Sequence, residues 1–254
     1  MCGIFGFVSK DKVKAVPIVL EGLKRLEYRG YDSSGLAVLT DSRIYSKKKS
    51  GRIMELEKVV SDDVMASIAI GHTRWATHGK PTDKNAHPHG DCTGKIYLVH
   101  NGIIENFKEL KSKLEKRGHI FKSDTDTEVA AHLIEDFSKN YSFEEAVRLA
   151  LKSIVGAYAF AIVNANNPTT MIVARNSSPL LVGFSESDKF VASDASAILP
   201  HTRKVVYLHD GEFAVLTPSD FRIATLDRKA VSRGQELIEW SQDEVGKITL
   251  PTGR

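Results

Sequence analysis

A cysteine directly follows the initiator methionine and opens an apolar run, Cys2-Gly3-Ile4-Phe5-Gly6-Phe7-Val8. Removal of Met1 would leave a thiol and a free α-amine on one residue, which would then hold both a nucleophile and a possible base. Reference pKa values of about 8.5 for a thiol and about 7.7–8.0 for an α-amine allow the neutral amine to accept the thiol proton near neutral pH. The plainer interpretation is a small residue in a buried first strand, and the rest of the chain must decide between the two.

Length and composition indicate an ordinary globular protein. The chain has 254 residues, of which 42% are hydrophobic and 26% charged, with a net charge of +3. Its strongest basic run, Lys47-Lys48-Lys49, is short and typical of a solvated hairpin edge, so we expect no nucleic-acid partner. No apolar stretch approaches about 18 residues, so we expect no membrane partner. Two cysteines make no disulfide framework and favour a cytoplasmic, reducing compartment.

Hydrophobic periodicity predicts many short strands and a few amphipathic helices, an α+β layered domain with helices outside packed sheets. We expect strands at 2–9, 35–39, 43–47, 67–71 and 95–100, and six more between 157 and 216. We expect helices at 13–26, 105–117, 125–137 and 142–153, the third opened by a capping box from Thr125 to Glu128. Residues 231–254 have weak periodicity and are predicted to form a tail or connector after a domain of residues 2–230.

The longest irregular stretch, residues 72–94, begins with a dense group of polar anchors, His72-Thr73-Arg74-Trp75-Ala76-Thr77-His78-Gly79. Long loops inside compact domains are usually functional or mobile. Arg74 can clamp a carboxylate with two parallel hydrogen bonds, and Thr77 and His78 can offer further donors to the same anion. Trp75 can supply an apolar wall. The alternative is a strand end with a surface ion pair and a buried tryptophan.

Two further groups are candidates for the chemistry. Asn101 and Gly102 end a predicted strand; they favour a tight turn, or an oxyanion hole made from the Asn101 amide and the Gly102 backbone N–H. Asp126 could pair with a substrate ammonium group, although acidic residues also favour the first turn of any helix. Arg29 and Asp32, in a Gly-rich loop after the first predicted helix, are a weaker sign of a site.

The nine histidines raise the possibility of a metal site. The densest group along the sequence is His87-Pro88-His89 with Cys92, but this pattern lacks the paired spacing of structural zinc sites. We therefore expect no metal and no other cofactor.

Six segments of the chain together resemble the N-terminal glutaminase domain of the glutamine–fructose-6-phosphate aminotransferase (isomerizing) family. These enzymes, the glucosamine-6-phosphate synthases, are class II glutamine amidotransferases. The resemblance runs from Cys2 to about Leu216 and implies the N-terminal-nucleophile hydrolase fold, a four-layer α/β/β/α sandwich with two antiparallel sheets. The matching segments are Cys2–Gly6, Leu26–Ser33, His72–Gly79, Asn85–His89, Val99–Asn106 and Thr125–Glu128.

The resemblance also implies a mechanism, in which mature Cys2 attacks the side-chain amide of L-glutamine, forms a γ-glutamyl thioester and releases ammonia, after which water releases glutamate. Asn101 and Gly102 then match the oxyanion hole, and Trp75 matches a loop that closes over the substrate. Arg29 is expected in the wall of the site or in the contact to a partner domain. The residues that match the positions holding the α-carboxylate and α-amine are Arg74, Thr77, His78 and Asp126.

In the family, two sugar-isomerase domains follow the glutaminase domain and use its ammonia to convert fructose 6-phosphate into glucosamine 6-phosphate. Nothing up to Arg254 supplies a sugar-phosphate site, so this partner pair is expected in cis beyond the sequence or in trans. Two alternatives stay open from the residues. One is an N-terminal-nucleophile hydrolase of another amide, and the other is a non-catalytic module that binds glutamine.

Overall fold

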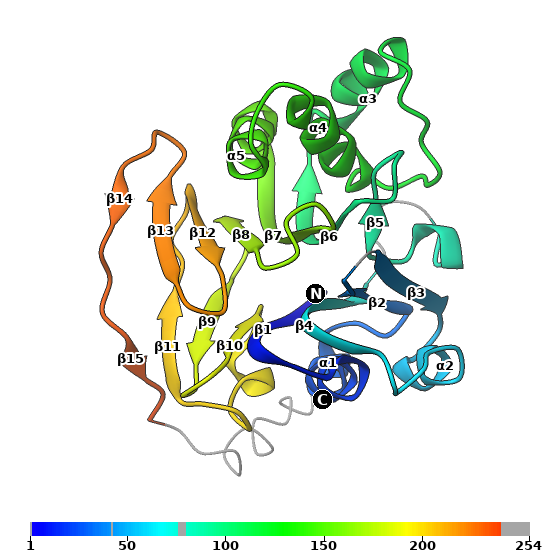
Figure 1. Ribbon diagram of the computed structural model, residues 1–254. Coiled ribbons are helices and arrows are strands. Elements are labelled where there is room, and N and C mark those ends of the chain that lie inside the picture. Colours follow the sequence, from blue (N-terminus) through cyan, green and yellow to red (C-terminus); the bar gives the residue numbers. More distant parts are fainter. Residues whose placement is uncertain (1, 42, 76–79, 240–254) are drawn as a thin grey trace, which may run out of the picture.

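Two antiparallel sheets pack face to face in the computed structural model, and helices cover the outer face of each sheet (Figure 1). The structure describes residues 2–41, 43–75 and 80–239. Helices α3, α4 and α5 lie on one side of the two sheets and α1 and α2 on the other, so the order of layers is α/β/β/α. The predicted α+β four-layer architecture is therefore confirmed.

The two longest strands of each sheet are neighbours, β1 and β4 in sheet A and β6 and β7 in sheet B. Sheet A contains, in spatial order, β15 (Glu236–Leu237), β11 (Lys204–Tyr207), β9 (Leu181–Phe184), β10 (Lys189–Ala192), β1 (Gly3–Lys14), β4 (Met65–Arg74), β2 (Ser33–Leu39) and β3 (Ile44–Ser50). Sheet B contains β14 (Ala230–Val231), β13 (Phe221–Thr225), β12 (Glu212–Leu216), β8 (Met171–Asn176), β7 (Gly156–Asn164), β6 (Ile96–Ile104) and β5 (His89–Gly90).

The first strand has apolar side chains on both of its faces, as its sequence predicts. Successive side chains of a strand point to opposite faces of the sheet. In β1, Ile4 and Val8 belong to the core between the sheets, whereas Phe5 and Phe7 belong to the core under α1. Cys2 is two residues before Ile4 and is therefore in phase with the residues that face the opposite sheet. This alternation directs the thiol into the sandwich.

Side chains alternate between the two faces in the same way in β4 and β6, the strands whose polar residues meet Cys2. Ile70 of β4 and Val99 of β6 lie in the core between the sheets. His72 and Arg74 continue the inward phase of β4, and Asn101 continues the inward phase of β6. The polar residues at the ends of three buried strands thus converge where the apolar core between the sheets stops.

The helices bury apolar stripes against the outer faces of the sheets. On the outside of sheet A, α1 (Ala15–Lys24) buries Val16, Val19, Leu20 and Leu23, with α2 (Ile53–Glu57) beside it. Sheet B is covered by α3 (Phe107–Lys116), α4 (Glu128–Ser138) and α5 (Phe143–Ser153). Short 3₁₀ turns occupy Glu27–Arg29, Asp83–Asn85 and Ala195–Ala197.

Several predicted boundaries were wrong. Helix α1 begins at Ala15 rather than at residue 13, because Val13 and Lys14 still pair with β4. Residues 101 and 102 do not form a turn, because β6 continues through them to Ile104.

The predicted capping box is also absent, since helix α4 begins at Glu128 and its N-cap Thr127 makes no side-chain cap bond. Glu128 instead accepts hydrogen bonds from the backbone N–H groups of Lys122 and Ser123, at 2.7 and 2.6 Å. Its carboxylate therefore holds the loop before α4, and not the first turn of the helix.

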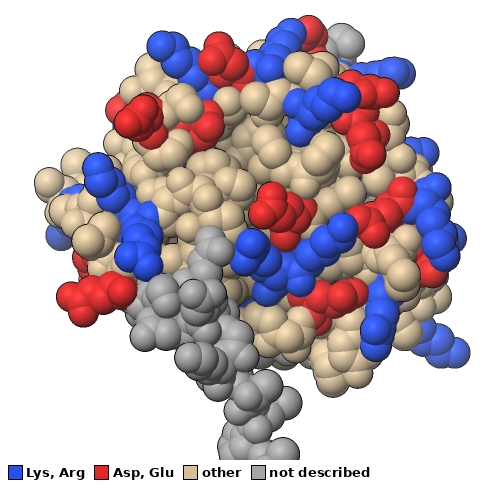
Figure 2. Space-filling model, turned by 90° about the horizontal axis from the view of Figure 1, so that it is seen from below, with Lys and Arg blue, Asp and Glu red and all other residues tan. Residues whose placement is uncertain are grey.

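The first part of the segment that begins at residue 231 packs against the rest of the domain. Strand β15 pairs with β11, and Ile238 is buried in the core under α1. Among the described residues no helix is long and apolar enough to cross a membrane. On the face shown in Figure 2, Lys and Arg side chains alternate with Asp and Glu side chains. An ion pair between Lys24 and Glu57, at 2.5 Å, links α1 to α2.

Candidate active site

Cys2 lies at the open end of the sandwich, partly buried, and its sulfur contacts the chain just after β4. The backbone N–H of Trp75 donates to Cys2 Sγ at 3.2 Å, and Sγ in turn lies 3.6 Å from the Trp75 carbonyl oxygen. Burial raises the pKa of the Cys2 thiol above its ordinary value, while the Trp75 N–H acts in the opposite direction. The thiol therefore holds its proton unless a base removes it.

Asn101 reaches Cys2 from the opposite sheet. Its side-chain Nδ2 donates to the Cys2 carbonyl oxygen at 3.1 Å. The orientation of this amide is set by His72, whose Nε2 lies 3.0 Å from Asn101 Oδ1 and 3.0 Å from the His100 carbonyl oxygen. Both of these partners accept, so Nε2 carries the imidazole hydrogen and the Asn101 Nδ2 group is turned toward Cys2.

Gly102 occupies a backbone conformation that requires glycine. Its φ is +134°, and a Cβ atom at this position would lie 2.0 Å from the Ala157 carbonyl oxygen. The residue lines the same small cavity as Cys2. The tight turn that the sequence favoured here is not formed, because β6 continues through Gly102 to Ile104.

The cavity beside Cys2 also contains the two charged residues expected to hold a substrate. Arg74 and Asp126 both line it, and both are at least nine-tenths buried. Asp126 Oδ2 accepts the backbone N–H of Ile104 at 2.7 Å, which fixes the carboxylate at the end of β6. A guanidinium and a carboxylate thus lie in one cleft with a thiol, where they can bind a ligand that carries an anion and a cation.

Four buried histidines lie in or next to this cleft, and sequence reasoning did not predict that they come together. They are His72, His87, His89 and His100. Burial lowers the pKa of His72 to about 3 and lowers those of the other three below the ordinary value. The Thr127 hydroxyl bridges the rings of His87 and His100 at 3.0 and 2.9 Å. The inward strand phase of His72 was a signal that could have predicted its burial.

The remaining predicted residues differ in where the structure places them. The Trp75 side chain is 48% exposed and packs edge-on against Tyr31, so it is not the buried tryptophan of the alternative interpretation. Thr77 and His78 lie outside the described residues. Arg29 is bound within the chain, since its Nη1 donates to Asp194 Oδ2 at 2.7 Å.

The histidine–cysteine group suggested by the sequence is divided in the structure. His87 and His89 belong to the buried histidine cluster at the cleft, whereas Cys92 lies beside His119, His132 and Glu135. Of the described residues, these four are the group whose atoms could hold a metal ion.

Comparison with known proteins identifies the chain through the segment that carries most of this cleft. Residues 72–200 match the model of a glutamine amidotransferase domain, which is half of the chain. That segment includes His72, Arg74, Asn101, Gly102 and Asp126.

Curated relatives match almost the whole chain. The glutamine–fructose-6-phosphate aminotransferase (isomerizing) of Pyrococcus horikoshii is 48% identical over 97% of this chain, and that of Aquifex aeolicus is 50% identical over 94%. The chain spans only 42% and 40% of the length of these two relatives. It therefore corresponds to part of a longer protein in each case.

Solved structures confirm the fold. The glutamine phosphoribosylpyrophosphate amidotransferase of B. subtilis, in complex with ADP and GMP, has a TM-score of 0.75 and 29% identity, and covers 90% of this chain and 50% of its own. A structure described as the allosteric regulatory enzyme of purine biosynthesis has a TM-score of 0.76 and 30% identity, and covers 89% of this chain and 49% of its own. The predicted class II amidotransferase fold is confirmed by these likenesses. The chain belongs to the glutamine amidotransferase domain family.

Proposed function

We propose that this chain hydrolyses L-glutamine to glutamate and ammonia, with Cys2 as the nucleophile. The observation that carries the proposal is the convergence of Cys2, from sheet A, and Asn101, from sheet B, across the open end of the sandwich. The Cys2 sulfur attacks the side-chain carbonyl carbon of glutamine, and the C–N bond breaks to release ammonia and leave a γ-glutamyl thioester. Water then attacks the thioester and releases glutamate and the thiol.

The tetrahedral intermediate of each step carries a negative oxygen that needs hydrogen-bond donors. The Asn101 Nδ2 group and the backbone N–H of Gly102 are the proposed donors. His72 is a positioning residue in this scheme, because it holds Asn101 Oδ1 and so keeps Nδ2 available to the oxyanion. A neutral His72, whose pKa is about 3, performs this role throughout the physiological range.

The zwitterionic end of glutamine is held by opposite charges in the same cleft. Arg74 would bind the α-carboxylate and Asp126 the α-ammonium group, because both are buried and line the cavity beside Cys2. Thr77 and His78 are proposed to add donors to the carboxylate. Trp75, exposed and directly after β4, is proposed to close over the bound substrate.

The base in this scheme is the α-amine of Cys2, which exists only after Met1 is removed. Because burial raises the pKa of the Cys2 thiol, a base beside it is required for attack. The amine lies on the same residue as the sulfur, and it returns the proton to the leaving ammonia.

The ammonia is proposed to pass to a pair of sugar-isomerase domains, in cis or in trans, that convert fructose 6-phosphate into glucosamine 6-phosphate. Support comes from the two curated relatives, which are longer than this chain and are named glutamine–fructose-6-phosphate aminotransferases. Residues 231–254 would form the connector, after a glutaminase domain of residues 2–230. The two free cysteines agree with a proposed cytoplasmic location.

The test is ammonia release by protein from which Met1 has been removed, compared between glutamine and a simple aliphatic amide. We expect release from glutamine and little from the aliphatic amide, because the latter has no ammonium and carboxylate for Asp126 and Arg74. Equal rates would indicate a hydrolase of other amides. Glutamine binding without ammonia would indicate a non-catalytic module, and either outcome overturns the proposal.

A further inference from the structure

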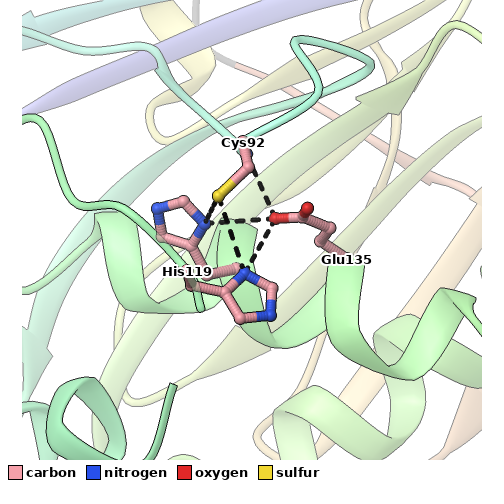
Figure 3. A group of neighbouring side chains, drawn as sticks. Cys92, His119 and Glu135 are labelled. Carbon is pink, nitrogen blue, oxygen red and sulfur yellow. Dashed lines mark hydrogen bonds and ion pairs between the residues drawn. The ribbon is translucent and has the colours of Figure 1, made fainter. Parts of the chain in front are cut away.

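Four side chains from three separate segments converge on one point outside the glutamine cleft. Cys92 follows β5, His119 follows α3, and His132 and Glu135 lie one helical turn apart on α4. Figure 3 shows the side chains of Cys92, His119 and Glu135 directed toward one another. One atom from each of the four residues lies within 4.8 Å of the other three.

Four of the six distances between these atoms are close to those of a tetrahedral metal site. Cys92 Sγ lies 3.7 Å from His119 Nδ1 and 3.5 Å from His132 Nδ1. Glu135 Oε2 lies 3.0 Å from the first nitrogen and 3.2 Å from the second. Zinc bonds of about 2.3 Å to sulfur and about 2.0–2.1 Å to nitrogen and oxygen, at tetrahedral angles, separate S from N by about 3.6 Å and N from O by about 3.3 Å.

Both histidines are oriented by carboxylates on their outer sides. His119 Nε2 lies 3.4 Å from Asp136 Oδ1, and His132 Nε2 lies 3.4 Å from Glu128 Oε1. Metal-binding histidines usually donate their second ring N–H to such a partner, which fixes the tautomer. With the hydrogen on Nε2, each Nδ1 directs a lone pair at the centre of the group.

A cation at the centre would suit that arrangement. Two nitrogen lone pairs, a carboxylate oxygen and a sulfur would otherwise face one another at 3.0–3.7 Å. A single divalent cation satisfies all four atoms at once. The backbone N–H of Ile120, 3.4 Å from Cys92 Sγ, is also a partner that suits a metal-bound thiolate.

We propose that Cys92, His119, His132 and Glu135 form a structural zinc site. Cysteine and histidine together favour zinc over calcium and magnesium, which prefer oxygen ligands. Four protein ligands leave no open position, as is usual in structural sites. His119 and His132 are buried and Glu135 is half-buried, whereas Cys92 is exposed. An ion can therefore enter the site from solvent on the side of Cys92.

The zinc would join the turn after β5 and the connection between α3 and α4 to α4 itself. One of its oriented histidines, His132, contacts Glu128, and Glu128 holds the loop that leads to Asp126 through the N–H groups of residues 122 and 123. The site would therefore fix the loop that carries the proposed partner of the substrate ammonium group, although its existence does not depend on the proposed glutaminase activity.

The metal content of the protein and the spectrum of its cobalt form test the site directly. We expect one zinc per chain after purification without chelator. Replacement of that zinc by Co²⁺ should give the d–d bands of tetrahedral cobalt and a sulfur-to-cobalt charge-transfer band. Because the chain has two cysteines, Cys2→Ala is the matched control: it should keep metal and band, whereas Cys92→Ala should lose the band. A band that is lost in Cys2→Ala and kept in Cys92→Ala would overturn the proposal.

Thiol reactivity provides a second measurement that needs no destabilising substitution. In the Cys2→Ala variant Cys92 is the remaining thiol, and we expect stoichiometric zinc to suppress its reaction with a thiol reagent and a chelator to restore it. Asp136→Asn, which alters the outer partner of His119, should weaken zinc binding about 10–100-fold. Purified protein that contains no zinc, takes up no Co²⁺ and reacts equally fast with or without zinc would refute the site.

Discussion

Acidification should destabilise this fold through the four buried histidines at the cleft. His72 is the case whose magnitude can be worked out, since it is fully buried and its pKa is lowered to about 3 by that burial. In the unfolded chain a histidine has a pKa of about 6.5. Below that value the unfolded state binds a proton that the folded state does not, so the free energy of unfolding falls as the pH falls.

The expected size follows from this difference in proton binding. As the pH falls from about 7.5 to about 5.5, protonation of one histidine in the unfolded chain raises the ratio of unfolded to folded protein about tenfold. The free energy of unfolding therefore falls by about 1.4 kcal/mol. The loss continues until the pH approaches about 3, where folded His72 is protonated as well. His87, His89 and His100 act in the same direction, because burial lowers their pKa values too. The whole protein should therefore lose more than His72 alone explains.

Urea unfolding at the two pH values and one ionic strength measures the effect. His72→Gln should reduce the pH-dependent loss by about 1.4 kcal/mol, while any cost of the substitution that is independent of pH cancels in the difference. His209→Gln makes the same substitution at an exposed histidine and is the matched control for the substitution itself. A wild-type protein that is equally stable at both pH values, or a His72→Gln protein with the full dependence, would refute the reasoning.

Three further predictions concern the cleft. Asn101→Ala should lower kcat for glutamine hydrolysis about 10²–10³-fold, measured as ammonia release at saturating glutamine, and an unchanged kcat would contradict its role as an oxyanion donor. Asp126→Asn should raise KM for glutamine about 10–100-fold through loss of a charged hydrogen bond, with a smaller effect on kcat; an unchanged KM would remove it from substrate binding. Gly102→Ala should lower the melting temperature more than Gly94→Ala, because both have positive φ but only at Gly102 would the new Cβ lie 2.0 Å from a carbonyl oxygen.

Residue patterns within single segments predicted much of the fold. Apolar residues on both faces of the first strand indicated the interior of a sandwich, and Ile4 and Phe5 do lie in the cores on opposite faces of β1. The amphipathic stripe of the first helix was also visible, although its start was not. Whether Val13 joins a strand or a helix depends on its partner Ala66 in β4, and single-segment periodicity contains no information about that partner.

Features that depend on contacts between segments could not be predicted in this way. Glu128 follows Thr125 by three residues, as in a capping box, but its carboxylate bonds to Ser123 and fixes the preceding loop. His72 and Asn101 are far apart in sequence and meet only because two sheets pack face to face. The sequence therefore identified the polar residues of the cleft, His72 among them, but not the contact by which His72 orients Asn101.

The proposed zinc site was missed for the same reason. Proximity along the sequence grouped Cys92 with His87 and His89, whereas the fold places it beside His119 and His132. A histidine and a glutamate three positions apart on one helix, as in His132 and Glu135, were the local signal that could have led to it.

The proposed role of Cys2 as the nucleophile is tested most directly by covalent labelling. Protein without Met1 is treated with an electrophilic analogue of glutamine, and the modified peptide is located by mass spectrometry. We expect a single label on Cys2, slowed by an excess of glutamine, and no label on Cys2 in protein whose Met1 is retained. A label on Cys92, or no label on the processed protein, would contradict it.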